Sequence, residues 1–396
     1  MDWERLAEAL AESVTPPASR WRHAIAITPR HEFVPRWWDT TYGGWVARVG
    51  AEDEEAWART AYSDRSIVTE VAGLHADHAD AGTGGRGRPT SSSTLPSLVA
   101  RMYDYAQVLP GVDVLDVGTG SGYGAALLAT RLGDEQVTTI DVDPYVTKVA
   151  GERMAALGLH PAVLTADTAE ELPGTYDRIV AMVSVRPVPA AWMRALRPGG
   201  RLVTVIAGTS LILTATKAPD DDPEWPGWAI GRIEWERAGF MHARPAPGDY
   251  PAERAVLFAN VRDARGEDTS VGRYPVIDVE EAWDISSMLE LAAPNIEHHH
   301  QRGADGSQTA WMIHPDGSWA RATGDGDEPP IVHQAGPRRL WDLLDQIRHR
   351  WVTHGELPVR GAHAYVTPDG VIHLARGDWH ANIAGPGDEP EVDRSA

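Results

Sequence analysis

The stretch VLDVGTGSGYG at residues 114–124 constrains the fold of this chain more than any other. Its apolar start is typical of a buried strand, and Gly118, Gly120 and Gly122 follow before a helical segment. Glycine has no Cβ, so such a turn can bend tightly and let a ligand approach the backbone closely. The stretch therefore predicts a strand, a ligand-binding turn and a helix.

Short β-like and helical segments alternate between residues 111 and 244. The β-like runs are 112–117, 136–140, 162–165, 177–183 and 201–207, and the helical runs are 122–131, 144–156 and 189–196. This alternation predicts a parallel sheet with helices on both faces. Two further runs, 211–216 and 230–236, predict a closing hairpin.

The ligand expected at the glycine turn is S-adenosylmethionine rather than NAD. The spacing is G-x-G-x-G, with Asp116 inside the motif and Tyr123 where a dinucleotide fingerprint has its third glycine. Asp141 ends the next strand, where a carboxylate can accept from both ribose hydroxyls, and Asp167 could receive the adenine amino group. The alternative is an ordinary strand-helix turn with two exposed aspartates. The predicted cofactor-binding residues are Asp116, Gly118, Thr119, Gly120, Ser121, Gly122, Tyr123, Asp141, Val142, Asp167 and Thr168.

The run TSSSTLP at residues 90–96 places five hydroxylated side chains before an expected helix at 96–108. A helix start needs only one such side chain as its N-cap, here at Thr94 or Leu95, and Pro96 suits the first turn. A capped helix alone leaves the other hydroxyls of the run unexplained. Hydroxyl donors at a helix N-terminus suit a carboxylate, because this end of a helix favours an anion.

Six blocks occur in order along the chain: TPRHEFVP (28–35), AYSD (61–64), TLPSLVARM (94–102), VLDVGTGSGYGAALLA (114–129), YDRIVA (176–181) and LRPGGRLV (196–203). Over roughly residues 1 to 245 the chain resembles the protein L-isoaspartyl O-methyltransferase family. The resemblance implies a Rossmann-like class I methyltransferase of the α/β class. It also implies S-adenosylmethionine as methyl donor, S-adenosylhomocysteine as product and carboxyl O-methylation as the reaction.

The resemblance also implies the catalytic hydroxyls. The family carries a serine before the helix that precedes the glycine loop, and its hydroxyl faces the methyl-accepting carboxylate. Alignment on Pro96 places Thr94 at that serine and Ser93 where an apolar residue is usual. We expect Thr94, helped by Ser93 and Ser92, to orient the acceptor. An aspartate is already ionised at neutral pH, so the enzyme must position the carboxylate and exclude water, without a general base.

Three functions stay open. Family relatives with an added C-terminal domain accompany lasso peptides, graspetides and lanthipeptides, and methylate an aspartate of the constrained peptide, which then closes to an aspartimide. The segment 270–396, the insertion 71–89 and Thr94 favour this subgroup. The first alternative is repair of isoaspartyl residues in aged proteins. The second is a non-catalytic peptide-binding module, which the intact glycine loop and Asp141 oppose.

The sequence suggests four regions. They are a helical and substrate-loop region (1–110), the S-adenosylmethionine-binding core (111–245), a linker (246–270) and a smaller C-terminal α+β domain (271–390) expected to recognise the peptide. In the C-terminal domain, Pro-Asp-Gly turns predict hairpins within 311–320 and 363–372, and 338–353 reads as a helix. Residues 1–38 are expected to be helical, 71–89 a mobile loop and the last twelve residues disordered.

Composition narrows the partners. A formal net charge of −21 opposes binding to nucleic acids and anionic membranes. Without cysteine the chain has no disulfide or thiolate, and the run His298 to His300 is expected to be a solvated loop rather than a metal site. Neither a signal peptide nor a membrane-spanning run is evident, so a cytoplasmic, soluble monomer is expected.

Overall fold

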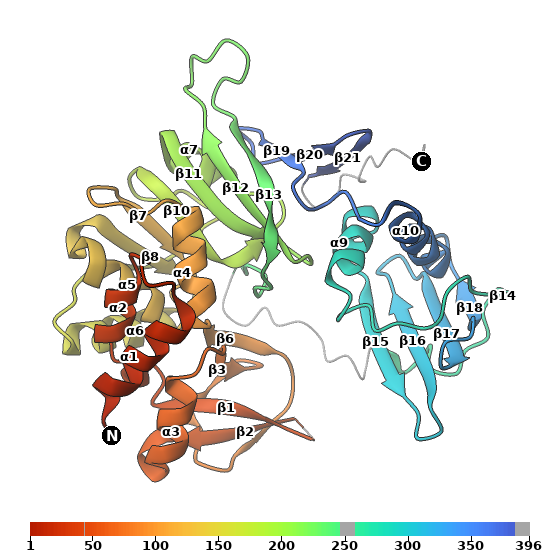
Figure 1. Cartoon of the computed structure of the whole chain (residues 1–396), viewed down its shortest axis with the longest axis horizontal. Coiled ribbons are helices and arrows are strands. Elements are labelled where there is room, and N and C mark those ends of the chain that lie inside the picture. Colours follow the sequence, from red (N-terminus) through yellow and green to blue (C-terminus); the bar gives the residue numbers. More distant parts are fainter. Residues whose placement is uncertain (43, 246–257, 385–396) are drawn as a thin grey trace.

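The computed structural model describes residues 1–42, 44–245 and 258–384 (Figure 1). At its centre is a ten-stranded sheet in the order β21-β20-β19-β13-β12-β11-β10-β7-β8-β9. Seven of these strands are β7 (Val114–Val117), β8 (Val137–Asp141), β9 (Ala162–Thr165), β10 (Tyr176–Val185), β11 (Leu196–Ile206), β12 (Leu211–Lys217) and β13 (Ala229–Arg237). Strands β7 to β11 are parallel to their neighbours within this group, whereas β12 and β13 form the predicted antiparallel hairpin.

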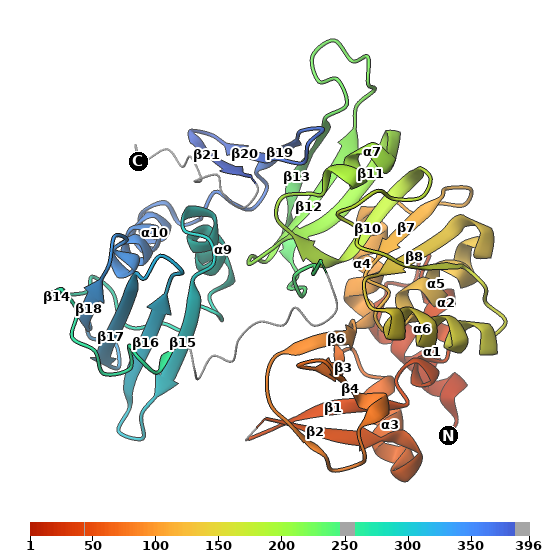
Figure 2. The same ribbon diagram turned by 180° about the vertical axis from the view of Figure 1, so that it is seen from behind.

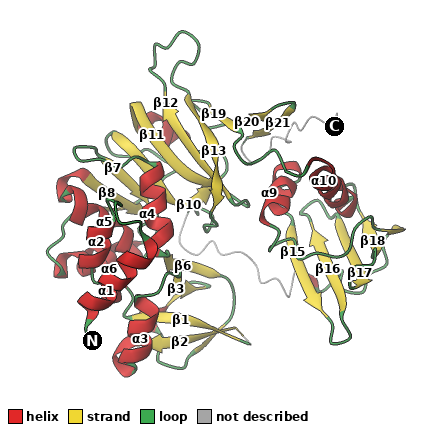
Figure 3. Ribbon diagram, in the orientation of Figure 1, coloured by secondary structure: helices red, strands yellow, loops and turns green. Residues whose placement is uncertain are grey.

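Helices cover both faces of this sheet, as the alternating pattern predicted (Figure 3). They are α4 (Pro96–Tyr105), α5 (Tyr123–Leu132), α6 (Pro144–Ala156) and α7 (Ala190–Ala195). Successive residues of β10 point to opposite faces, so Val180 joins the core formed with α4 and α5, whereas Ile179 joins the core that contains Trp192 of α7. Both faces are therefore buried.

The N-terminal region contains a second sheet that the sequence did not predict. After α1 (Trp3–Val14), α2 (Arg22–Ile27) and a 3-10 turn, η1 (Arg30–Phe33), the strands follow in the order β4-β3-β1-β2-β5, with β6 also paired to β3. The elements are β1 (Arg36–Thr41), β2 (Gly44–Val49), η2 (Gly50–Glu52), α3 (Glu54–Ala61), β3 (Ile67–Val71), β4 (Leu74–His75), η3 (Ala76–His78), β5 (Gly84–Gly85) and β6 (Pro89–Ser93). The expected loop 71–89 therefore carries β4, η3 and β5. Short strands need only backbone partners, so a Gly-rich and His-rich stretch can form them.

The C-terminal unit is a five-stranded sheet with two helices. Its order is β14-β18-β17-β16-β15, which places β14 and β15 at opposite edges. The elements are β14 (Asp268–Val271), α9 (Trp283–Ala292), β15 (Glu297–Arg302), β16 (Ser307–Ile313), β17 (Trp319–Asp325), β18 (Ile331–Ala335) and α10 (Leu340–His354). The hairpin β16-β17 and the helix α10 lie where the sequence predicted them. His298 to His300 lie on β15, so the expected loop is a strand, and no group of three metal-binding side chains occurs within the described ranges.

The chain returns to the central sheet after α10. Strands β19 (His363–Val366), β20 (Ile372–Arg376) and β21 (Trp379–Ile383) extend that sheet from β13, with Val366 opposite Ala229 (Figure 2). The hairpin β19-β20 is confirmed, but the expected domain 271–390 is divided between two sheets. Residues 246–257 of the expected linker and the twelve C-terminal residues lie outside the described residues. None of the described helices is both long and apolar enough to span a bilayer.

Candidate active site

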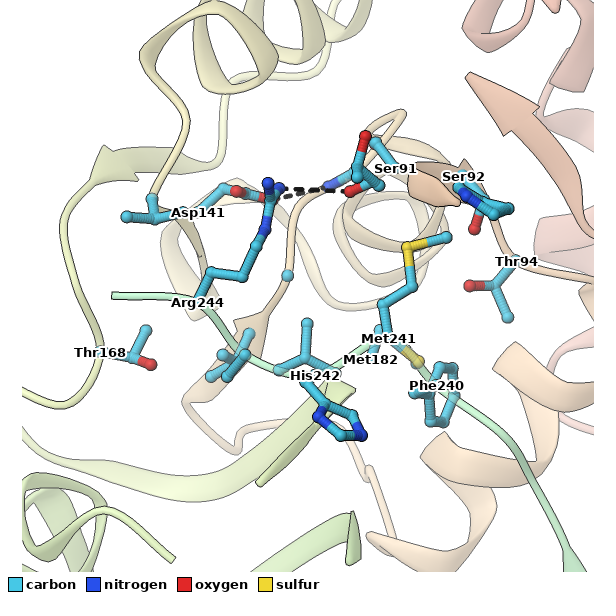
Figure 4. Close-up of a pocket in the computed structure, with 18 of the residues that line it drawn as sticks. Ser91, Ser92, Thr94, Asp141, Thr168, Met182, Phe240, Met241, His242 and Arg244 are labelled. Atoms are coloured by element: carbon cyan, nitrogen blue, oxygen red, sulfur yellow. Dashed lines mark hydrogen bonds between the residues drawn. The ribbon is translucent and has the colours of Figure 1, made fainter. Parts of the chain in front are cut away.

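A cleft of about 320 Å³ opens at the carboxyl ends of β7, β8 and β10. Ligands in open α/β sheets bind at this edge. Strand β6 closes one side of the cleft and the segment 239–244 forms another wall. Figure 4 shows Ser92 and Thr94 on one side of the cleft and Asp141 and Thr168 on the other.

The glycine loop touches strand β6 directly. Gly120 has a φ of +50°, and a Cβ at this position would lie 2.8 Å from the carbonyl oxygen of Ser92. Only glycine allows both this backbone conformation and this close approach. The conformation of the loop therefore fixes how near the hydroxyl-bearing strand can come to the ligand cleft.

Asp141 faces the cleft from the end of β8. One carboxylate oxygen accepts from the backbone N–H of Gly120 and the other from that of Asp143, both at 3.2 Å. Burial raises the pKa of Asp141 above its usual value. Each oxygen keeps a lone pair for a further donor, so the carboxylate can still accept from a pair of ribose hydroxyls.

Asp116 lies behind the glycine loop and is 1% exposed. It accepts from the Tyr103 hydroxyl at 3.2 Å and from the Thr139 hydroxyl at 2.9 Å. Thr139 in turn lies 2.8 Å from the Thr119 hydroxyl, which connects this network to the loop. Burial raises the pKa of Asp116 to about 7. The hydrogen bonds that connect Asp116 through Thr139 to Thr119 therefore help to hold the glycine loop in position.

The structure brings most of the predicted site residues together. The cleft is lined by Ser92, Thr94, Gly118, Gly120, Asp141, Val142 and Thr168. A smaller adjoining cavity is lined by Asp116, Thr119, Ser121 and Tyr123, together with Ser92, Thr94 and Gly118. Ser93, Gly122 and Asp167 line neither space. Gly122 is instead the N-cap residue before α5, with a φ of +90°, and the Asp167 carboxylate accepts from the backbone N–H of Ala169.

The hydroxyl run divides into distinct environments. Thr90 donates to Glu70, and Ser91 accepts from the Thr69 hydroxyl. Ser93 is 1% exposed, and its Oγ has no hydrogen-bond partner within the described part of the chain. Ser92 on β6 and Thr94 just after this strand both line the cleft, as Thr90 and Ser91 do, whereas Ser93 does not. The sequence analysis expected Ser93 to help Thr94 and Ser92 orient the acceptor, but in the structure the Ser93 side chain does not line the cleft.

The hydroxyl run does not cap helix α4. The backbone N–H of Leu95 donates to Ser66 Oγ at 3.2 Å, and that of Ser97 donates to Asp64 Oδ1 at 3.0 Å. The cap therefore comes from the end of the AYSD block and the residues after it, and the Thr94 hydroxyl is not used for it. Leu95 is the N-cap residue of α4, so the expected boundary at Thr94 or Leu95 is confirmed, but no side chain of the hydroxyl run makes a capping hydrogen bond.

Arg30 holds the hydroxyl run in place, a role that the sequence did not reveal. Its side chain is completely buried and donates to the carbonyl oxygens of Ser93 and Thr94, both at 3.2 Å. It also donates to three carbonyls of the segment 61–65 and lies over the Tyr123 ring. Burial lowers the pKa of Arg30 to about 10, so the side chain stays charged at neutral pH. The TPRHEFVP block, which contains Arg30, was the sequence feature that could have pointed to this role.

The segment 239–244 was also missed. It runs beside β10, where Ser184 donates its N–H to the Met241 carbonyl at 2.8 Å and accepts from the N–H of Ala243 at 2.9 Å. Phe240 and Met241 from this segment line the cleft, as does Met182 of β10. No sequence motif marks these residues, because they reach the cleft through tertiary contacts.

Comparison with known proteins decides the family. The model of the protein-L-isoaspartate(D-aspartate) O-methyltransferase family matches residues 4–222, which is more than half of the chain. The chain belongs to this family. The protein-L-isoaspartate O-methyltransferase of Ignicoccus hospitalis is 35% identical over 134 residues, 32% of this chain and 64% of the relative. That of Methanopyrus kandleri is 30% identical over 205 residues, 50% of this chain and 74% of the relative.

A solved structure titled protein-L-isoaspartate O-methyltransferase shares the fold, with a TM-score of 0.50 and 18% identity. The alignment covers 94% of this chain and 98% of that one, so it extends into the region of the C-terminal unit.

Members of the protein-L-isoaspartate O-methyltransferase family are carboxyl O-methyltransferases that use S-adenosylmethionine, as the sequence predicted for this chain. The residues of the cleft fit this cofactor. The Asp141 carboxylate lies at one end of the cleft and can still accept hydrogen bonds from ribose hydroxyls. The glycine loop, which has no room for a Cβ at Gly120, lies beside it.

Proposed function

We propose that this protein methylates the free carboxylate of isoaspartyl residues in peptides and proteins. One observation carries the proposal: the hydroxyls of Ser92 and Thr94 lie across a single cleft from Asp141 and beside the glycine loop. The family match supports the same reaction. Acceptor and methyl donor would then meet between β6 and the loop.

The reaction requires little proton chemistry. S-adenosylmethionine, when bound, supplies a methyl group on a positively charged sulfur. A carboxylate oxygen forms the new bond to this methyl carbon while the carbon–sulfur bond breaks, and the bonding pair stays on sulfur. A methyl ester and neutral S-adenosylhomocysteine result, so the charges balance without a general base.

The protein must therefore hold the carboxylate in line and keep water away. Hydroxyl donation from Ser92 and Thr94 would orient one oxygen of the carboxylate. Two neutral donors hold the anion less tightly than a lysine would, so its oxygen remains a nucleophile. Met182 and Phe240 supply apolar walls that exclude water from the reacting atoms.

Modification of an ordinary aspartate in a constrained ribosomal peptide, of the lasso peptide, graspetide or lanthipeptide type, is the second candidate. The methyl group of Thr94 narrows the acceptor position relative to serine, and this favours a different carboxylate geometry. The ester carbon would then be attacked by the backbone nitrogen of the next residue. Methanol leaves with the amide proton, and an aspartimide remains.

Mass spectrometry separates the candidates. Purified protein and S-adenosylmethionine are incubated with an isoaspartyl peptide, the same peptide with normal aspartate, and a macrocyclic aspartyl peptide. We expect one added methyl group on the isoaspartyl peptide alone. Net loss of one water on the macrocycle alone would establish the second candidate and reject the first.

A further inference from the structure

A second, larger cleft of about 1030 Å³ continues from the acceptor cleft. The two share the walls Pro89, Thr90 and residues 241–244. The outer cleft extends to Thr209 and Ser210 of the central unit and to Trp283, Ser286 and Asn295 of the C-terminal unit. Its size lies at the top of the range of about 300–1,000 Å³ for small-molecule pockets, so it can hold several residues of a peptide.

The C-terminal unit is joined to the opposite side of this cleft. Arg88, just before β6, forms an ion pair with Glu297 of β15, and the two residues are 209 positions apart in the chain. Arg186, at the end of β10, donates to the backbone carbonyl of Glu290 on α9 at 3.3 Å. These contacts keep the far wall close to the acceptor cleft.

His242 stands where the two clefts meet. The backbone N–H of Gly208 donates to His242 Nε2 at 3.1 Å. A backbone N–H can only donate, so Nε2 must be the accepting nitrogen and the neutral ring carries its proton on Nδ1. Within the described residues, Nδ1 has no protein partner, so its N–H is a donor with a fixed position.

Two further polar groups of the outer cleft have no hydrogen-bond partner in the described part of the chain. They are the side chains of Ser286 on α9 and Asn295 after α9. Neither is charged, and a hydroxyl and an amide can each pair with the N–H or carbonyl of a peptide backbone. Such groups recognise a chain without reading its side chains.

We propose that the outer cleft binds the peptide chain that flanks the acceptor residue, with His242 Nδ1 donating to a backbone carbonyl of that chain. This inference rests on the proposed function. It assigns Ser286 and Asn295 of the C-terminal unit to the same peptide. The occupant follows from continuity, because any residue whose carboxylate lies between Ser92 and Thr94 must continue its chain away from the acceptor cleft.

The test compares an isoaspartyl tripeptide with a nonapeptide that has the same centre. We expect a lower KM for the nonapeptide with the wild-type protein. His242→Phe should raise that KM by up to about tenfold, the effect of one hydrogen bond, and should raise the tripeptide KM less than the nonapeptide KM. His242→Asn keeps a donor near the position of Nδ1 and should restore most of the affinity.

The role of the C-terminal unit is tested separately, with variants that cannot disturb Gly208. Ser286→Ala and Asn295→Ala should each raise the nonapeptide KM a few-fold, whereas Ser270→Ala on the far edge strand β14 should not. Equal effects on both peptides, or no effect on either, would overturn the inference.

Calorimetry with S-adenosylhomocysteine present tests binding without turnover. If wild-type protein methylates neither peptide but binds the nonapeptide, and His242→Phe weakens this binding, the proposed function fails and the peptide site stands. If the nonapeptide is methylated but the variants bind it as tightly as wild type, the peptide site fails and the function stands. Absence of nonapeptide binding to wild-type protein overturns the peptide site outright.

Discussion

The guanidinium of Arg30 donates to the carbonyl oxygen of Thr94 at 3.2 Å, from a side chain that no solvent reaches. Through its further bonds to Ala61, Ser63 and Arg65, the same group connects the hydroxyl run to the segment before β3. The position of the Thr94 hydroxyl, which is expected to orient the methyl-accepting carboxylate, therefore depends on Arg30, a residue that does not line the cleft.

Replacing Arg30 by lysine should lower both stability and turnover. An ammonium group cannot reach the five carbonyls that the guanidinium serves, and each buried carbonyl left without a donor costs about 1–3 kcal/mol. We expect a lower Tm and, below it, a reduced kcat with little change in the Kd of S-adenosylhomocysteine. The exposed Arg59→Lys is the matched control. An unchanged kcat in Arg30→Lys would show that the hydroxyl run is held by other contacts.

Removing single hydroxyls should separate Thr94 and Ser92 from Ser93. Thr94→Ala and Ser92→Ala should each lower kcat by about tenfold to hundredfold, because a hydrogen bond to a charged acceptor contributes about 1.5–3 kcal/mol. Ser93→Ala removes a buried hydroxyl that has no partner within the described residues, so activity should persist and Tm should stay equal or rise. Steady-state kinetics and thermal unfolding of the three proteins check this. Loss of activity in Ser93→Ala alone would contradict the geometry.

Replacement of Asp141 should weaken cofactor binding. With the carboxylate gone, the two expected bonds to ribose hydroxyls are lost, and the Kd of S-adenosylhomocysteine should rise by about tenfold to hundredfold in Asp141→Ala. Titration calorimetry measures this change directly. The exposed Glu135→Gln serves as a charge-matched control, and equal Kd values for Asp141→Ala and wild type would exclude the assignment.

The buried Asp116 should make stability depend on pH. Its folded pKa of about 7 lies above the unfolded value of about 3.9, so the folded protein holds this proton more tightly. The contribution to the free energy of unfolding is therefore largest below about pH 4 and falls as pH rises to about 7. The Asp116→Asn variant has no carboxyl group at this position, so its stability does not depend on this protonation. Compared with wild type, it should gain Tm between about pH 5 and pH 8, and parallel Tm profiles would reject the shifted pKa.

The sequence by itself determined the local elements and the cofactor end of the site. The glycine spacing required a tight turn, and the α/β alternation placed Asp141 at the carboxyl end of the strand that pairs with β7. The Pro-Asp-Gly turns and the apolar stripe of α10 were equally readable. All of these depend on backbone preference and hydrophobic periodicity within a short window, which is why one sequence suffices.

Only the tertiary structure decided which hydroxyls face the cleft, since this depends on how β6 pairs with β3. It also decided that β19 to β21 return to the central sheet, and that Arg30 and His242 reach the site. Strand partners and buried donors are chosen by long-range hydrogen bonding and burial. Neither long-range hydrogen bonding nor the burial of a donor produces a periodic pattern in the sequence of the residues involved.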